Sequence, residues 1–222
     1  MKLSIICPCY NEENTCKKVV EDLLELPFDK EIIVVDDGSF DKSNEILSKI
    51  EGIKLITKKN GGKGSAMKEG LKHVTGDVVV PFDLDGEYNV NDLEPGLILS
   101  KEADVVYGSR RLCKTNKQFS GLSFYIGGIG LTIITNLLYQ SKITDEPTCI
   151  KIATKEVYDS LNLQDDGFGW EPEMTAKILK RGIKIVEYPI HYYPREVKEG
   201  KKIKWKDGLI AVRILLKWRF KK

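Results

Sequence analysis

The chain has 222 residues, of which 41% are apolar and 31% charged, with a formal net charge of +2. This length and composition suit one large globular domain with a sizeable core. The five cysteines lack metal-ligand spacing, since Cys7-Pro8-Cys9 has one intervening residue, so a cysteine metal site is excluded and reduced thiols are expected. Residues 1–10 are too short for a secretory signal, which predicts a cytoplasmic protein.

Apolar and polar segments alternate regularly over the first 85 residues. Strands are predicted at 3–7, 31–35, 53–57 and 77–82. Helices are predicted at 41–50, at 65–73 and over about ten residues ending near 26. This alternation indicates an α/β fold whose mostly parallel central sheet carries helices on both faces.

Polar clusters follow all four predicted strands, at 8–12, 36–39, 60–64 and 83–87. Ligands of such sheets bind outside the carboxyl ends of the strands, and all four clusters lie there. Asp83 and Asp85 follow the run Val78-Val79-Val80, where carboxylates can meet a hard cation such as Mg²⁺ or Mn²⁺ bound to phosphates. Taken singly, such acids also fit a turn with a helix cap, but four clusters at one rim favour a binding site.

The second half of the chain is less regular. A strand at 104–111 ends in two arginines, a helix is predicted at 170–181, and a strand at 183–192. Residues 119–141 carry no charge and are long enough to span a bilayer at about 1.5 Å per residue. A span would place the two halves of one site on opposite sides of the membrane, so one or two helices at a membrane interface or against the core are expected instead.

The C-terminal segment is cationic. Ten Lys and Arg residues stand against two acids between 198 and 222, with Arg195 just upstream, which implies an anionic partner. Residues 203–220 predict a basic amphipathic helix with Leu209, Val212, Leu216 and Phe220 on one face. That face suits either an anionic membrane surface or packing on the core.

Together, the ordered motifs resemble the inverting family 2 glycosyltransferases with a GT-A fold. The resemblance rests on Pro8-x-Tyr10-Asn11-Glu12, Val35-Asp36-Asp37-Gly38-Ser39, Gly62-Lys63-Gly64-Ser65-Ala66, Asp83-x-Asp85, Gly108-Ser109-Arg110 and Thr144-Asp145. Glu173, Glu187-Tyr188-Pro189, Arg195 and Gly200-Lys201-Lys202 are similar to its dolichol-phosphate mannose or glucose synthase branch. The resemblance covers essentially the whole chain.

This resemblance implies one Rossmann-like GT-A domain over residues 1–222. Residues 1–110 would form the nucleotide-sugar-binding half, 111–200 the acceptor-side half and 201–222 the basic amphipathic tail. Asp83, Asp85 and Glu87 would hold Mg²⁺ or Mn²⁺. The remaining donor-site residues implied by the resemblance are Pro8, Tyr10, Asn11, Glu12, Asp37 and Lys63.

The same resemblance implies a phosphate acceptor bound by Arg110, Arg195 and Lys202. With Asp85, the two arginines are the predicted catalytic residues, because Arg suits bidentate recognition of phosphate. An ionised phosphate needs no general base. One departure is that residues 124–130 lack the Arg and Ser that archaeal-type mannose synthases carry in their interface helix.

If the acceptor is instead a hydroxyl, a carboxylate must remove its proton, and Glu171, Glu173 and Asp165 are the candidates. The leading hypothesis is a metal-dependent inverting transferase that moves a hexose from a UDP- or GDP-sugar to a polyprenyl phosphate, peripherally on the cytoplasmic membrane face. The alternative acceptor is a hydroxyl of a saccharide or lipid. A third interpretation is a non-enzymatic module that binds anionic membranes or nucleic acid. Under the leading hypothesis, no nucleic-acid partner is expected.

Overall fold

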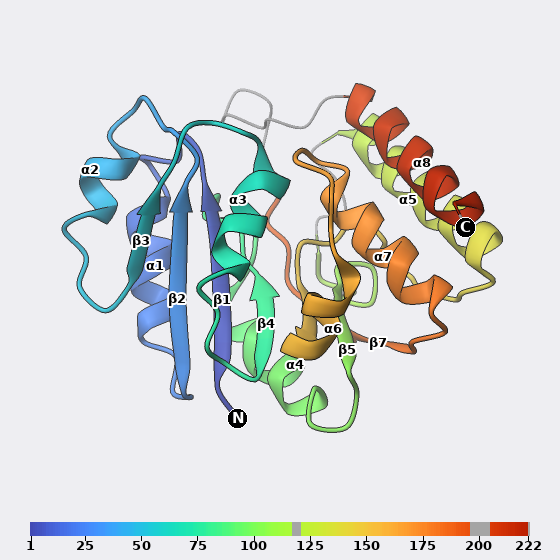
Figure 1. Ribbon diagram of the computed structural model, residues 1–222, viewed down its shortest axis with the longest axis horizontal. Helices are drawn as coiled ribbons and strands as arrows, with labels where there is room; N and C mark the ends of the chain where they lie inside the picture. Colours follow the sequence, from blue (N-terminus) through green and yellow to red (C-terminus); the bar gives the residue numbers. More distant parts are fainter. Residues whose placement is uncertain (117–120, 196–204, 222) are drawn as a thin grey trace.

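The computed structural model describes residues 1–116, 121–195 and 205–221. Its centre is a seven-stranded sheet in the order β3-β2-β1-β4-β6-β5-β7 (Figure 1). The strands are β1 (Leu3–Cys9), β2 (Lys30–Asp36), β3 (Lys54–Thr57), β4 (Val78–Pro81), β5 (Val105–Ser109), β6 (Lys151–Thr154) and β7 (Ile185–Pro189).

Most neighbouring strands are parallel, as predicted. β1 pairs in parallel with β2 and β4, β2 with β3, and β5 with β7. β6 is antiparallel to both β4 and β5. The polar clusters after β1, β2 and β4 therefore reach one edge of the sheet, and the arginines after β5 reach it as well.

Helices cover both faces of the sheet, which confirms the predicted α/β architecture. One face packs against α1 (Cys16–Leu24), α2 (Ser43–Leu47) and α4 (Leu93–Leu99). The other packs against α3 (Lys63–Leu71), α6 (Lys155–Leu161) and α7 (Trp170–Lys180). Burial on both faces explains why β4 is continuously apolar rather than alternating. The helix at 41–50 is shorter than predicted, and α4 and α6 were not predicted because each is only seven residues long.

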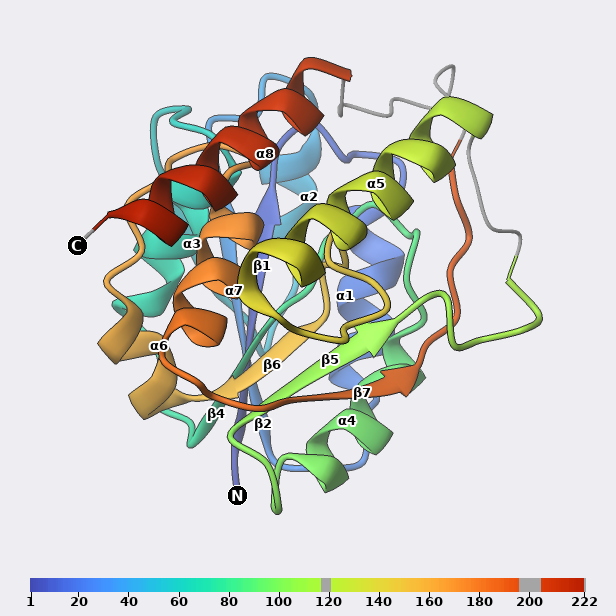
Figure 2. The same ribbon diagram turned by 90° about the vertical axis from the view of Figure 1, so that its right-hand side faces the viewer.

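Two further helices form a layer beside the sheet. α5 (Leu122–Tyr139) and α8 (Trp205–Phe220) run side by side and pack on α7 (Figure 2). Their shared core consists of Leu131, Ala176, Ala211, Ile214, Leu215 and Trp218. Within the described ranges, no helix is long and apolar enough to cross a membrane. Residues 122–139 of the uncharged segment thus form one helix that packs on the rest of the protein, which is one of the two placements expected.

The outer faces of α5 and α8 are unusually apolar. Leu137 is 76% exposed on α5, and Leu209 and Phe220 are 61% and 75% exposed on α8. The apolar face predicted for the C-terminal helix is therefore largely its outer face, with Leu216 also exposed and Val212 partly buried. The α8 residues that pack in the core are Ala211, Ile214, Leu215 and Trp218, so this helix has apolar side chains on two faces.

Gly38 is required by the turn that follows β2. Its φ is +74°, and a Cβ there would lie 2.8 Å from the backbone nitrogen of Asn60. We expect Gly38→Ala to lower the free energy of unfolding by about 2 to 3 kcal/mol, since backbone strain and a clash with main chain add. Urea unfolding measures this. In Gly208→Ala on α8, where a Cβ meets nothing within 4 Å, stability should rise by about 0.5 to 1 kcal/mol. Equal effects of the two substitutions would contradict the prediction.

Candidate active site

A cavity of about 990 Å³ lies at the carboxyl ends of β4 and β5. Some of its polar lining residues follow these two strands, and others, among them Lys63, Asp145 and Glu171, come from elsewhere in the chain. Its apolar walls come from α5 and from the first two turns of α8. Such a concave site with few convergent polar groups is the usual form of a small-molecule site.

Asp83 and Asp85 line this cavity directly after β4. Asp83 forms an ion pair with Lys63 at 2.8 Å, and Asp85 forms one with Arg195 at 3.2 Å. Burial, reinforced by the charges of Asp83 and Glu87, raises the pKa of Asp85 to about 7. Two acids this close in a buried place favour any cation that neutralises them.

The predicted donor set fits a hard divalent cation in its chemistry. Asp83 and Asp85 offer carboxylate oxygens, the ligand type that Mg²⁺ and Mn²⁺ prefer. Among the described residues, no three His, Cys, Asp or Glu side chains converge to hold a metal ion by themselves. A metal here would therefore take further oxygen ligands from phosphate groups or water.

Glu87, the third predicted ligand, holds the segment after β7. Its carboxylate accepts the Tyr192 hydroxyl at 2.7 Å and the backbone N–H of Arg195 at 2.9 Å. The Glu87 carbonyl also accepts the N–H of Tyr193 at 2.8 Å. Its predicted role as a metal ligand therefore stays a prediction, while the structure shows that it positions Arg195.

Lys63 lies at the first turn of α3 and lines the cavity. Its ammonium contacts Glu171 at 2.6 Å as well as Asp83. Burial alone lowers the pKa of Lys63, but Asp83 and Glu171 outweigh it and raise that pKa well above its ordinary value. Lys63 is thus a permanently charged group at the predicted donor site, held from two sides.

The predicted nucleoside residues lie at the ends of β1 and β2, beside the described lining of the cavity rather than within it. The Asp37 carboxylate accepts the N–H groups of Gly61 and Gly62 and pairs with Lys58 at 2.7 Å. It therefore fixes the turn that precedes Lys63. Pro8 is half-buried on β1.

Tyr10 and Asn11 belong to the same rim. The Tyr10 ring packs edge-on against Phe40 at 6.0 Å between centroids. Asn11 has a φ of +52°, and its side chain accepts the N–H of Phe40 at 2.9 Å. Glu12 points elsewhere, to Arg195, with 2.8 Å between its carboxylate and the guanidinium.

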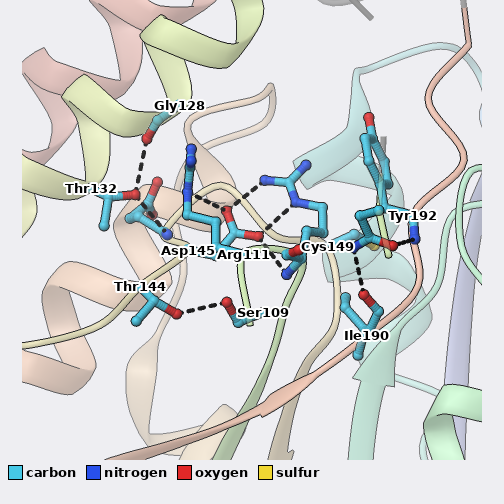
Figure 3. Close-up of polar contacts among 12 residues, drawn as sticks. Ser109, Arg111, Gly128, Thr132, Thr144, Asp145, Cys149, Ile190 and Tyr192 are labelled. Atoms are coloured by element: carbon cyan, nitrogen blue, oxygen red, sulfur yellow. Dashed lines mark hydrogen bonds and ion pairs between the residues drawn. The ribbon is translucent and has the colours of Figure 1, made fainter. Parts of the chain in front are cut away.

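A second charged group in the cavity lining includes Arg111 and Asp145 (Figure 3). Asp145 lies between Arg110 and Arg111, accepting two side-chain bonds from Arg110 at 2.7 Å each and facing Arg111 at 3.9 Å. The Arg110 guanidinium also stacks over the Tyr192 ring at 4.9 Å. One carboxylate thus serves two guanidiniums, which leaves an excess positive charge in the wall.

The cavity residues that were not predicted as ligands include Arg111, Asp145 and Cys149. The Arg111 Nε is buried without a hydrogen-bond partner in the described part of the chain. In the sequence, Asp145 stands out only through the Thr144-Asp145 motif, and Arg111 only as one of two arginines at the end of a predicted strand. The position of Arg111 next to Arg110 was the signal that could have identified it as a ligand. Lys202, the remaining predicted phosphate ligand, lies outside the described residues.

The three candidate general bases differ in position. Glu171 lines the cavity. Glu173 is 1% exposed and turned inward, accepting the N–H groups of Gln164 and Asp165 and pairing with Lys177 at 2.5 Å. Asp165 accepts the N–H of Gly167 at 2.8 Å in its own turn. Only the position of Glu171 suits proton transfer in the cavity.

Comparison with known proteins decides the family. The model of a family described as glycosyl transferase family 2 matches residues 4–161. This chain belongs to that family. It is accordingly a glycosyltransferase, as its motifs predicted.

Three relatives of this transferase are named as glycosyltransferases. Glycosyltransferase AglJ of Haloferax volcanii is 31% identical over 86% of this chain and 63% of its own length. UDP-N-acetylglucosamine--dolichyl-phosphate N-acetylglucosaminyltransferase of Methanococcus voltae is 31% identical over 84% and 83%. Dolichyl-phosphate beta-glucosyltransferase ALG5A of Trichomonas vaginalis is 28% identical over 86% and 65%. The chain therefore spans between 63% and 83% of these relatives.

Solved structures agree on the fold of this transferase. Glucosyl-3-phosphoglycerate synthase from Mycobacterium tuberculosis, crystallised with Mg²⁺ and UDP, has a TM-score of 0.73 and 18% identity. The likeness covers 98% of this chain and 79% of that one. At this identity it establishes the GT-A fold and no more.

The raised pKa of Asp85 gives this transferase a specific dependence on pH. An ordinary Asp has a pKa of about 3.9 when unfolded, so between about pH 4 and pH 7 the folded state holds a proton that the unfolded state has lost. The protonated Asp85 side chain makes its full contribution to the free energy of unfolding below about pH 4, and this contribution is lost as pH rises through about 7. Relative to the wild type, Asp85→Asn should therefore gain about 1 to 2 kcal/mol between pH 5 and pH 8 in urea unfolding.

Asp77→Asn is the matched control, because exposed Asp77 precedes the same strand at its opposite end. That variant should keep the wild-type pH profile. Parallel profiles for Asp85→Asn and the wild type would show that Asp85 is ionised throughout.

Proposed function

We propose that this glycosyltransferase moves a hexose from a nucleoside diphosphate sugar to a polyprenyl phosphate. The observation that carries the proposal is the charge layout of the cavity. Paired carboxylates, Asp83 and Asp85, line one wall, and Arg110 and Arg111 sharing Asp145 line another. The first pair suits a metal-bound diphosphate, and the second suits a phosphate that attacks it.

The relatives support this choice of acceptor. Two of them are named as dolichyl-phosphate glycosyltransferases, and one of these names carries a UDP-sugar. Residues 1–110 would supply the donor side and residues 111–200 most of the acceptor side. Glu171 belongs to residues 111–200 but forms an ion pair with Lys63 of the donor side.

Asp83 and Asp85 would hold Mg²⁺ or Mn²⁺, with Glu87 behind them. A divalent cation at this place acts as a Lewis acid that neutralises the diphosphate leaving group. Lys63, which pairs with Asp83, would bind a diphosphate oxygen. Pro8, Tyr10, Asn11 and Asp37 would border the nucleoside.

Arg110, Arg111 and Arg195 would orient the acceptor phosphate, with Lys202 as the further predicted ligand. A phosphate oxygen of the acceptor forms the new bond to the anomeric carbon, while the bond from that carbon to the diphosphate oxygen breaks. The acceptor is already ionised near neutral pH, so none of these residues has to remove a proton. Attack from the face opposite the leaving group inverts the anomeric configuration.

A hydroxyl acceptor is the second candidate, because Glu171 lines the cavity. In that case Glu171 would take the proton of the acceptor hydroxyl, a step worth about 10² to 10⁴ in rate. The Glu171 carboxylate is already engaged in an ion pair with Lys63 at 2.6 Å. The phosphate acceptor therefore remains the first choice.

The function is tested by transfer of labelled sugar. Purified full-length protein with Mn²⁺ is incubated with radiolabelled UDP-glucose, UDP-N-acetylglucosamine or GDP-mannose and polyprenyl phosphate. The expected product is an acid-labile glycolipid, and calorimetry with UDP and GDP in Mn²⁺ identifies the base. An acid-stable product on a lipid or saccharide hydroxyl would favour the second candidate.

Asp85→Asn should lower transfer by about 10²-fold or more, because it removes one carboxylate of the proposed metal site. Calorimetric titration of Mn²⁺ with the nucleotide should show a parallel loss of affinity. Asp77→Asn again serves as the control and should transfer at the wild-type rate. Near-normal turnover of Asp85→Asn would remove the metal assignment.

We further propose that the outer face of α5 and α8 docks peripherally on the cytoplasmic membrane leaflet. Exposed Ile126, Ile133 and Leu137 lie on α5, and exposed Leu209 and Phe220 lie on α8. Basic residues of α8 and its end accompany them: Lys206, Arg213, Lys217, Arg219 and Lys221. This combination suits insertion at the head-group level of an anionic bilayer.

Substituting Leu137 and Phe220 together by Glu should lower binding to phosphatidylglycerol vesicles at least about tenfold, since it removes two apolar side chains from the interface. Co-sedimentation measures the bound fraction. Ile98→Glu is the control, because Ile98 is 57% exposed on α4, far from α5 and α8 (Figures 1 and 2). An equal loss in the control variant would contradict the docking face.

A further inference from the structure

Glu12 and Arg195 form an ion pair between residues 183 positions apart. The guanidinium donates to the two carboxylate oxygens of Glu12 at 2.8 and 3.4 Å. The side chains of Arg195 and Glu12 are only 16% and 9% exposed. A pair this sheltered is screened little by solvent, so its geometry is well defined.

The backbone of Glu12 is fixed on a rigid part of the fold. Its N–H donates to the Ser43 hydroxyl at 2.7 Å, which ties it to α2. Its carbonyl accepts the N–H groups of Thr15 and Cys16, the residues that begin α1. Thr15 in turn donates to the Leu84 carbonyl at 2.7 Å, between Asp83 and Asp85. Glu12 therefore has a fixed position relative to the carboxylates after β4.

Arg195, by contrast, lies after β7, and its own position depends on carboxylates from elsewhere. Glu87 accepts its backbone N–H, Asp85 accepts one guanidinium nitrogen at 3.2 Å, and Glu12 accepts two. The Arg195 Nε is buried without a hydrogen-bond partner in the described residues. It lies 3.8 Å from the Glu87 carboxylate, so three carboxylates, those of Glu12, Asp85 and Glu87, surround the guanidinium.

We propose that Glu12 is a positioning residue that holds the Arg195 guanidinium for the acceptor phosphate, rather than a ligand of the nucleoside. The proposal rests on the proposed function, because it assigns Arg195 to that acceptor. It revises the role that the resemblance implies for Glu12. Both oxygens of its carboxylate accept bonds from the Arg195 guanidinium.

The two roles of Glu12 make opposite demands on measured constants. A nucleoside ligand contributes to nucleotide affinity, and its loss acts independently of Arg195. A positioning residue leaves nucleotide affinity intact and lowers the rate of transfer, and its effect disappears once Arg195 is gone. Binding and turnover measured on the same variants therefore separate the roles.

The test is a double-mutant cycle on the full chain with Glu12→Gln, Arg195→Ala and their combination. Calorimetry with Mn²⁺ and UDP or GDP gives nucleotide affinity, and labelled transfer to polyprenyl phosphate gives kcat and KM. We expect Glu12→Gln to lower kcat about tenfold while nucleotide affinity stays within about twofold. In the Arg195→Ala background the same substitution should change kcat less than about twofold.

Glu12→Asp is the conservative variant, and it should recover part of the activity lost in Glu12→Gln because it keeps the charge. Circular dichroism and thermal unfolding show that each variant is folded. Nucleotide affinity that falls as much as kcat, or additive effects in the cycle, would overturn the proposal. A wild-type protein that binds nucleotide but transfers no sugar to polyprenyl phosphate would instead count against the proposed acceptor, and the calorimetry of Glu12→Gln would still decide its nucleoside role.

Discussion

The structure depends on the balance of charge around the carboxylates that follow β4. Asp83, Asp85 and Glu87 lie within five residues of one another, and their repulsion in a sheltered place is costly unless cations neutralise it. Lys63 at the start of α3 and Arg195 after β7 provide those cations. The acids thereby fix the positions of two segments that lie far apart in the sequence.

The same principle shapes another part of the cavity lining with the signs reversed. Asp145 is 0% exposed, and it receives Arg110 in a two-bond contact while Arg111 shares it at longer range. A single acid beneath two guanidiniums orders them without cancelling their charge. The cavity therefore presents acidic and basic residues on different segments, an arrangement that suits the two phosphate-bearing substrates proposed above.

Short-range sequence patterns predicted what local periodicity determines. The alternation of strands and helices placed Asp83, Asp85 and Arg110 at one edge of the sheet, and the structure confirms that edge. The partners of these residues could not be predicted in the same way, since Lys63 meets Glu171 and Arg195 meets Glu12 across long loops of chain. The C-terminal helix shows a related limit: periodicity identified the stripe of Leu209, Leu216 and Phe220, but only packing reveals that a different face meets the core.

One glycine of α5, Gly128, lets a cation approach that helix. A Cβ at Gly128 would lie 3.1 Å from the Arg111 guanidinium, so the absence of a side chain there lets Arg111 approach α5 from the β5 loop. Arg111 also stacks over the Tyr125 ring of α5 at 5.3 Å. A cation thus reaches the helix from outside it. Because α5 carries this contact on one side and exposed apolar residues on another, a lipid phosphate bound at Arg111 would keep its hydrocarbon chain beside the proposed membrane face.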